Sequence, residues 1–463
     1  MVFPLADQRT ANATRRLSNK NECHTEPDPI LNCRGQATAI VQATIAFVRQ
    51  MPFSEVQGIY HVPMPPTNST LPTVKVSPRG ATRLKSGHVW VYRSDIVSAD
   101  GVEPGAMVAV VDHRGKPLGT ALYSSSSQIA IRMIADEAVK DLPALLRQRI
   151  ADAIAYRERF VHNTDAYRVI FSEADVLPGL IVDRYNDILS VQVLTQAMDA
   201  APVRDTVVTE LTARLHPASI FERVDPRVRE LEAIPALASS LLQGEKTVTS
   251  FTMNGIQFHF DALEGQKTGS FLDQRENYFA AAHYAHGDAL DVFCYQGGFA
   301  LHLAPRCSQI TGVDSSRPAL EIADQNAVLN RARLGGKEIE WIEANAFDLL
   351  RDYATSNRRY DTIVLDPPAF AKSKRDLDAA LRGYKELNLR ALKMLRPGGI
   401  LVTCSCSYHV SQADFLEMLA SAALDVHRTL RLIEFRGQAK DHPVLLNVPE
   451  TAYLKCVIAS VSE

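Results

Sequence analysis

Short hydrophobic runs and helical periodicity alternate along the last third of the chain. The runs lie at residues 290–293, 309–314, 340–343, 362–365 and 400–403, and apolar positions repeat with helical spacing between them. This alternation is typical of a parallel sheet with helices on both faces. We therefore predict an α/β domain over residues 251–463, and we expect its ligands at the carboxyl ends of the strands.

The preceding residues show other patterns. Five β-rich runs at 74–76, 88–92, 107–111, 118–123 and 129–134 predict a small β-barrel over residues 74–140. Helical periodicity at 142–160 and 201–215, with strand-like runs at 169–171, 180–182, 188–194 and 219–222, predicts a central α+β domain over residues 141–250. Residues 1–73 are polar, which predicts a disordered or atypical extension. A targeting peptide, an RNA-binding arm or a true start at Met64 are alternatives for this extension.

Composition narrows the class of protein. The chain has 463 residues, 46% of them hydrophobic and 22% charged, as in ordinary globular proteins. The formal net charge of −3 lacks a global nucleic-acid signature, so any RNA contact must come from local patches. The seven cysteines form no CxxC pair and no zinc spacing, which favours reduced thiols, a cytoplasmic protein and no metal site. No apolar run approaches the roughly 20 residues of a membrane span, and no secretory signal is present.

A ligand loop is predicted where the run at 290–293 meets two glycines. Asp291 lies on the strand, Gly297 and Gly298 open the following turn, and Asp314 ends the next strand. Glycines let the backbone approach a ligand closely, and a terminal carboxylate can accept both hydroxyls of a ribose. The G-x-G-x-x-G pattern of nicotinamide enzymes is missing. The pattern therefore suits a ligand without a pyrophosphate, such as S-adenosylmethionine.

Two further strand ends carry reactive groups. Asp366 follows the run at 362–365, while Cys404 and Cys406 end the run at 400–403. A thiol is a candidate nucleophile, and an acid beside a flat ring can hydrogen-bond to the edge of a base. Both cysteines point the same way in an extended run, but Cys406 lies closer to the carboxyl end. We therefore favour Cys406 as the reactive thiol and interpret Cys404 as a small buried residue.

Several motifs together resemble one family. They occupy residues 265–275, 291–299, 366–370, 383–388, 404–407 and 441–444. The chain from about residue 74 onward resembles the class I methyltransferases that form 5-methylcytosine in 23S ribosomal RNA, in the branch with an N-terminal PUA domain. The resemblance implies a PUA barrel, a central α+β domain and a Rossmann-like domain with seven strands. It also implies S-adenosylmethionine as methyl donor and large-subunit ribosomal RNA as partner, and it leaves a homodimer open.

The resemblance also implies residue roles. Cys406 would add to carbon 6 of cytosine, and Asp366 would hydrogen-bond to ring nitrogen 3 or the amino group. The cofactor residues would be Asp291, Phe293, Tyr295, Gly297, Asp314 and Asn345, with Lys267 and Arg275 holding the donor's carboxylate or ordering its loop. The chain departs from the family's pattern at Ser270, Gln296 and Asn345. An Asn345 oxygen could still accept a hydrogen bond from the adenine amino group. Ala369 replaces the second cysteine of other RNA cytosine methyltransferases, so the releasing base is unassigned.

Basic residues next to these motifs predict RNA contacts. Lys372, Lys374 and Arg375 follow Asp366 closely, and Arg83, Lys85 and Trp90 belong to a basic and aromatic stripe on the predicted barrel. Phosphate contacts and base stacking suit looped or single-stranded RNA. A solvated charged face is the alternative for 372–375, and a core position is the favoured alternative for Trp90.

Two other functions stay open. An enzyme of this fold could methylate an exocyclic amine and would need no thiol. A non-catalytic RNA-binding factor for ribosome assembly would bind the methyl donor without transferring its methyl group. Replacement of Cys406 separates the first rival from cytosine C5 methylation, and a transfer assay separates the second.

Overall fold

The computed structural model describes residues 71–263, 270–371 and 373–463. Residues 1–70 of the extension predicted for residues 1–73 lie outside the described residues. Lys267 and Lys372 also lie outside them. Within the described residues, no helix is both long enough and apolar enough to span a bilayer.

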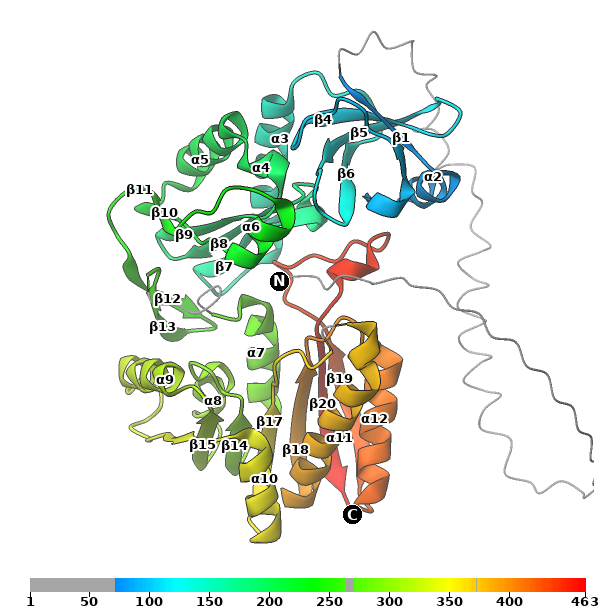
Figure 1. Cartoon of the computed structure of the whole chain (residues 1–463). Coiled ribbons are helices and arrows are strands. Elements are labelled where there is room, and N and C mark those ends of the chain that lie inside the picture. The colour runs from blue at the N-terminus through cyan, green and yellow to red at the C-terminus, as the bar shows by residue number, and fades with distance from the viewer. Residues whose placement is uncertain (1–70, 264–269, 372) are drawn as a thin grey trace, which may run out of the picture. The chain divides into compact units, whose positions relative to one another are not determined.

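A mixed sheet of six strands forms the first part (Figure 1). Its elements are β1 (Thr73–Val76), α2 (Pro78–Lys85), β2 (Trp90–Tyr92), β3 (Ile96–Ser98), β4 (Met107–Val111), β5 (Pro117–Tyr123) and β6 (Ile129–Ala135), and the strand order is β2-β6-β5-β4-β1-β3. The five predicted runs correspond to β1, β2, β4, β5 and β6. The sequence pattern missed α2, a short helix that Ser77 caps by accepting a hydrogen bond from the Gly80 amide.

A five-stranded sheet with helices forms the central part. Its elements are α3 (Leu142–Phe160), β7 (Ala166–Phe171), β8 (Leu180–Tyr185), β9 (Ile188–Val193), α4 (Gln196–Asp199), α5 (Ala201–Leu215), β10 (Ser219–Glu222), α6 (Pro226–Glu232) and β11 (Ser240–Gln243). The strand order is β11-β10-β9-β8-β7. Apolar residues of α3 and α5 share one buried cluster with this sheet, which agrees with the predicted α+β character.

A hairpin, β12 (Val248–Met253) and β13 (Ile256–Asp261), follows. It begins before the domain boundary that the sequence predicts at residue 250. Phe251 and Phe258 of the hairpin share one buried cluster with Tyr185 of β8 and Tyr278 of the last domain. The hairpin is therefore part of the hydrophobic core that joins the central residues to the last domain.

The last domain contains the predicted parallel sheet. Its elements are α7 (Arg275–Tyr284), β14 (Asp288–Val292), α8 (Gly298–Leu303), β15 (Gln309–Asp314), α9 (Arg317–Leu329), β16 (Glu340–Glu343), α10 (Ala346–Thr355), β17 (Tyr360–Leu365), α11 (Leu377–Met394), β18 (Leu395–Ser405), α12 (Gln412–Asp425), β19 (Thr429–Arg436) and β20 (Lys455–Ser462). The strand order is β16-β15-β14-β17-β18-β20-β19, with β20 antiparallel to both neighbours. One buried cluster joins α7 and α8 to the sheet, and another joins α10, α11 and α12 to it (Figure 1). Helices therefore cover both faces, as predicted.

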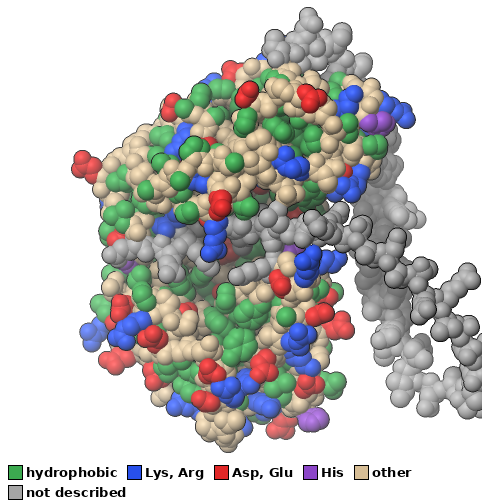
Figure 2. Space-filling view, in the orientation of Figure 1, with side chains coloured by type: hydrophobic (Ala, Val, Ile, Leu, Met, Phe, Trp, Pro, Cys, Tyr) green, Lys and Arg blue, Asp and Glu red, His purple; other side chains and the backbone are tan. Residues whose placement is uncertain are grey.

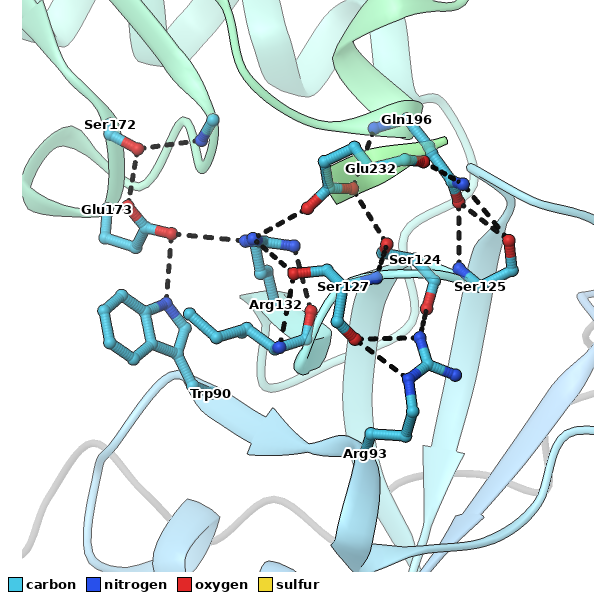
Figure 3. Close-up of polar contacts among 12 residues, drawn as sticks. Trp90, Arg93, Ser124, Ser125, Ser127, Arg132, Ser172, Glu173, Gln196 and Glu232 are labelled. Carbon is cyan, nitrogen blue, oxygen red and sulfur yellow. Dashed lines mark hydrogen bonds and ion pairs between the residues drawn. The ribbon is translucent and has the colours of Figure 1, made fainter. Parts of the chain in front are cut away.

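A buried polar network links the first sheet to the central residues, and it settles the position of Trp90 (Figure 3). The Trp90 indole N–H donates to Glu173 Oε1 at 3.0 Å, and Arg132 forms ion pairs with Glu173 and Glu232. The Trp90 side chain is only 3% exposed. The burial of the ring favours the core alternative for Trp90 over stacking on an RNA base.

Candidate active site

The loop after β14 is held in an unusual backbone conformation. Phe293 and Tyr295 have positive φ angles of 68° and 50°, and Gly297 has a φ of 83°. Positive φ is uncommon for residues with a side chain and costs energy that the surrounding structure must offset. The Phe293 and Cys294 amides donate to the Val313 carbonyl at 2.8 and 3.0 Å and thereby fix the loop against β15.

The loop needs glycine at position 298, because there is no room for a side chain there. A Cβ atom added to Gly298 would lie 2.5 Å from the Tyr278 ring and hydroxyl. A pocket opens at the same place, between the loop and the end of β17. Its lining residues are Met253, Phe258, Ser270, Phe271, Tyr278, Phe293, Cys294, Tyr295, Gln296, Gly298, Phe299 and Asp366. The loop, two of its predicted cofactor residues and Asp366 therefore lie at one site.

Two carboxylates flank the loop. Asp291 is 1% exposed, and its Oδ2 accepts a hydrogen bond from the Ala300 amide at 2.8 Å. Its Oδ1 is buried and has no hydrogen-bond partner among the described residues. Burial, with a smaller contribution from Asp314, raises the pKa of Asp291 to about 7. Asp314 accepts hydrogen bonds from the Tyr295 and Ser316 amides, each at 2.9 Å.

The acids suit a cationic ligand such as S-adenosylmethionine. The unpartnered oxygen of Asp291 lacks a hydrogen-bond donor, which is costly for a buried carboxyl group. A ligand that carries an ammonium and a sulfonium group can supply a donor and positive charge near this group. Asp314 is partly exposed at the end of β15, where it can face hydroxyl groups. The residues present therefore fit a methyl donor of this kind.

Asn345 is placed differently from the expectation. Its Oδ1 caps α10 and accepts hydrogen bonds from the Phe347 and Asp348 amides at 2.9 and 3.3 Å. A carbonyl oxygen has two lone pairs, and both are used here. The arrangement therefore does not support Oδ1 as the acceptor for an adenine amino group.

Ser270 and Gln296, the two pocket residues that depart from the family's pattern, contact each other. Ser270 Oγ donates to Gln296 Oε1 at 3.5 Å, and Gln296 also donates from Nε2 to the Tyr295 hydroxyl at 3.4 Å. Ser270 and Gln296 are both buried. The small Ser270 and the long Gln296 therefore form a hydrogen-bonded pair in the lining of the pocket.

Asp366 is held at the end of β17 by a residue that the sequence analysis missed. Gln274 is 2% exposed and donates from Nε2 to Asp366 Oδ1 at 2.9 Å. Its own Oε1 accepts a hydrogen bond from Asn277 Nδ2 at 2.7 Å. Burial, with contributions from Asp273 and Asp291, raises the pKa of Asp366 to about 8. The raised pKa favours the protonated carboxyl group, a form that can donate a hydrogen bond.

Cys404 near the end of β18 and Cys406 directly after this strand have different environments. Cys404 is 0% exposed, pairs in register with Cys456 and belongs to the core. Cys406 is partly exposed, and its sulfur lies 4.0 Å from the Pro367 carbonyl oxygen. The structure thus agrees with the interpretation of Cys404 as a buried residue and brings Cys406 next to the Asp366-Pro367 segment.

Arg275 and the motif at 441–444 form a buried junction. Arg275 is 1% exposed and donates to Asp441 Oδ1 at 3.1 Å. Asp441 Oδ2 accepts from the Arg168 amide at 2.9 Å, and the Asp441 carbonyl accepts from Arg157 at 2.8 Å. Arg275 therefore connects the last domain to the central residues. This arrangement favours the expectation that Arg275 orders structure over a direct contact with the donor's carboxylate.

Replacing Asp441 by alanine should destabilise the protein by about 3–5 kcal/mol, because it leaves the buried Arg275 charge with only the longer, 3.7 Å ion pair to Glu276. Burial alone would raise the pKa of Asp441, but His442, Arg275 and the Arg168 amide together lower it. Since the folded pKa lies below the unfolded value of about 3.9, this stabilisation is complete above that pH and is lost as pH falls. Denaturant unfolding at pH 7 measures the effect.

The exposed pair of Asp348 with Arg351 offers the matched control. Asp348→Ala should change the free energy of unfolding by less than about 1 kcal/mol. Equal stability losses in the two variants would contradict the role of the buried junction.

The remaining predicted RNA contacts lie at the surface. Lys374 and Arg375 are exposed in a short 3-10 helix after the Asp366-Pro367 segment. Arg83 lies 3.4 Å from Asp95 and stacks over Tyr92, and Lys85 lies 3.7 Å from Asp112. Figure 2 shows positive and negative side chains interspersed over the face in view. RNA contacts of these residues stay predictions.

Comparisons with known proteins agree with this site. A profile described as a PUA-like domain matches residues 74–136, and one described as an S-adenosylmethionine-dependent methyltransferase matches residues 178–457. The ribosomal RNA large subunit methyltransferase I of Shewanella denitrificans is 38% identical over 397 residues, which cover 84% of this chain and 99% of that protein. The protein of the same name from Photobacterium profundum is 38% identical over 387 residues, or 80% and 95% of the two chains.

Solved structures show the same fold. A structure described as a SAM-dependent methyltransferase from Streptococcus mutans matches with a TM-score of 0.70 and 18% identity, over 84% of this chain and 99% of that one. A methyltransferase structure solved with SAH matches with a TM-score of 0.71 and 19% identity over the same shares. The predicted fold class and the predicted methyl donor are confirmed. The chain belongs to the S-adenosylmethionine-dependent methyltransferases with a PUA-like domain, in the family of the ribosomal RNA large subunit methyltransferases I.

Proposed function

We propose that this protein methylates carbon 5 of a cytosine in large-subunit ribosomal RNA through a transient covalent bond to Cys406. The observation that carries the proposal is the placement of Cys406 beside the Asp366-Pro367 segment, at the carboxyl ends of neighbouring strands. The names of relatives that match almost their whole length support ribosomal RNA as the substrate. Such a substrate supports a cytoplasmic location for the protein. Dimerisation stays a prediction, which analytical ultracentrifugation would measure.

Cys406 would provide the covalent step. Carbon 5 of cytosine is a poor nucleophile, but addition of a thiolate at carbon 6 gives carbon 5 the character of an enamine carbon. S-adenosylmethionine, when bound, supplies the electrophilic methyl group that carbon 5 attacks. A base must then remove the carbon-5 proton, so that the ring double bond re-forms and the sulfur leaves. The structure assigns no residue to this last proton transfer.

Asp366 would stabilise the adduct. Ring nitrogen 3 gains negative charge as the sulfur adds to carbon 6. A protonated carboxyl group can donate a hydrogen bond to this nitrogen, and preorganised donors of this kind stabilise developing charge. The hydrogen bond from Gln274 would keep the carboxyl group in one orientation.

The substrate base must leave its stack to reach Cys406, which costs a few kcal/mol unless it is already unpaired. Lys374 and Arg375 lie close in sequence to Asp366 and are exposed, so they would contact RNA phosphates there. Arg83 and Lys85 would contribute further phosphate contacts through the PUA-like domain.

Asp314→Ala should weaken binding of the methyl donor by about 10- to 100-fold, the loss expected for hydrogen bonds to a charged group. Calorimetric titration with S-adenosylhomocysteine measures the affinity. Asp314→Asn keeps one oxygen for the loop amides and should show a smaller loss. Wild-type affinity in the alanine variant would exclude Asp314 from the donor site.

The central test is a methyl transfer assay with labelled S-adenosylmethionine and undermethylated large-subunit ribosomal RNA, followed by nucleoside analysis. Labelled 5-methylcytidine alone would support the proposal. An N-methylated nucleoside would favour the exocyclic amine chemistry instead. Saturable donor binding without labelled RNA would favour a non-catalytic assembly factor.

A further inference from the structure

Lys455 is a buried lysine next to the candidate nucleophile. It is the first residue of β20, pairs in register with Ser405 of β18 and is 7% exposed. Its Nζ donates to the Ser407 carbonyl at 2.6 Å and to the Tyr453 carbonyl at 2.9 Å. The lysine therefore ties the backbone just after Cys406 to the residues that lead into β20.

The charge of Lys455 lacks the usual partner. Buried lysines normally pair with a carboxylate, because desolvation of an ammonium group is expensive. Among the ion pairs of the described residues, none includes Lys455. Burial lowers the pKa of Lys455 to about 8, and Cys406 is the charged neighbour that acts in the opposite direction. The sulfur of Cys406, once ionised, is thus the group that the lysine charge can stabilise.

The sulfur, in turn, needs a cation. The titratable groups that face Cys406 are Asp366 after β17, Asp273 before α7, Tyr384 of α11 and Lys455 of β20. Burial and the two aspartates raise the pKa of the Cys406 thiol to about 12, and Lys455 is the charged group that lowers it. A nucleophilic cysteine reacts as the thiolate. Among the described residues, Lys455 is therefore the charged group that favours the thiolate form of Cys406.

We propose that Lys455 is a positioning residue for Cys406, which fixes the backbone after the cysteine and stabilises the thiolate form of its sulfur. This inference rests on the proposed role of Cys406 as nucleophile. The thiol proton passes to solvent on ionisation, and Lys455 keeps its own three protons throughout. The step therefore needs no further reactant.

The test measures the thiol without RNA or methyl donor. Iodoacetamide alkylates the thiolate with loss of iodide, and mass spectrometry of the peptide that contains Cys406 gives the rate at each pH. In the full-length protein, Lys455→Met should slow alkylation by about tenfold or more at pH 7, which corresponds to one pKa unit of the thiol. The difference should shrink above pH 8, because the wild-type lysine loses its proton there.

Two variants serve as controls. Lys455→Arg keeps a cation and should restore most of the alkylation rate, with the difference from Lys455→Met persisting above pH 8. Lys393→Met removes an exposed charge near the end of α11 and should leave the profile unchanged. Superimposable profiles of wild type and Lys455→Met would overturn the inference. If Lys455→Met fails to fold, the wild-type and Lys455→Arg profiles decide: identical profiles above pH 8 would also overturn it.

Failure of the inference and failure of the proposed function give different results. If Cys406→Ala still forms 5-methylcytidine, the covalent mechanism is wrong, whatever the alkylation profiles show. If Cys406→Ala is inactive and the alkylation profile does not depend on residue 455, Cys406 remains the nucleophile and the role of Lys455 is wrong.

Discussion

Cys406→Ala is expected to abolish formation of 5-methylcytidine, with a loss of about 10⁴-fold or more in kcat. The magnitude follows from measurements on other enzymes, in which loss of the nucleophile removes nearly all of the covalent catalysis. Without the sulfur, carbon 5 keeps the low nucleophilicity of an unactivated pyrimidine. Single-turnover transfer to undermethylated ribosomal RNA measures the loss, and donor affinity should stay close to wild type.

Cys404→Ala is the matched control. Cys404 is two residues away, but it is 0% exposed and packs in the core opposite Cys456. The Cys404 thiol also contacts Asp366 and Gln274, so the variant should lose a small part of its methyl transfer rate, far less than Cys406→Ala, together with a modest amount of stability from the small cavity. Equal activity losses in the two alanine variants would show that the strand end matters for folding and not for chemistry.

RNA that contains 5-fluorocytidine provides a direct view of the covalent bond. Fluorine at carbon 5 cannot leave as a proton does, so the sulfur cannot be expelled after methyl transfer. The wild-type protein should then migrate with the RNA in a denaturing gel, and Cys406→Ala should not. A denaturant-stable complex with Cys406→Ala would assign the covalent bond to another residue.

Much of the site follows from the sequence because of sheet geometry. Parallel strands carry their carboxyl ends to one edge, so residues after neighbouring strands meet there. β17 and β18 are parallel neighbours, and they bring the segment after Leu365 next to Cys406. The same rule correctly placed the Gly-rich loop at this edge. The strands β19 and β20 were expected only through the family resemblance, because their segments lack a clear helix–strand alternation.

The residues that hold the site could not be predicted in this way. Gln274 contacts Asp366 across 92 positions of the chain, and Lys455 contacts Ser407 across 48. Such contacts depend on tertiary packing, which local spacing does not encode. The choice between the alternatives for Trp90 and Arg275 could not be made for a related reason, since the composition of a segment does not show which of its polar or aromatic side chains turn inward. A charge at the start of the apolar run 455–462 was the one available signal for Lys455.

Asp366→Ala is expected to lower kcat by about 10²- to 10³-fold, the cost of removing one preorganised donor to a developing charge. The alkaline side of the pH profile carries more information than the size of the loss. Because the folded pKa of Asp366 is about 8, the protonated carboxyl group prevails below this pH and is lost above it. Since the Cys406 thiol, with a pKa of about 12, keeps ionising above pH 8, loss of the Asp366 proton should flatten the rise of wild-type transfer with pH, as far as transfer depends on a donated hydrogen bond.

Asp366→Asn separates this donor from the other groups that titrate nearby. An amide donates at every pH, so the variant should keep more activity than Asp366→Ala, and its rate should lose the part of the flattening above pH 8 that belongs to the carboxyl group. Lys455 also titrates near pH 8, so the flattening that persists in Asp366→Asn should disappear when Lys455→Arg is added. A profile of Asp366→Asn with the same shape as that of the wild type would contradict the role of Asp366 as a hydrogen-bond donor.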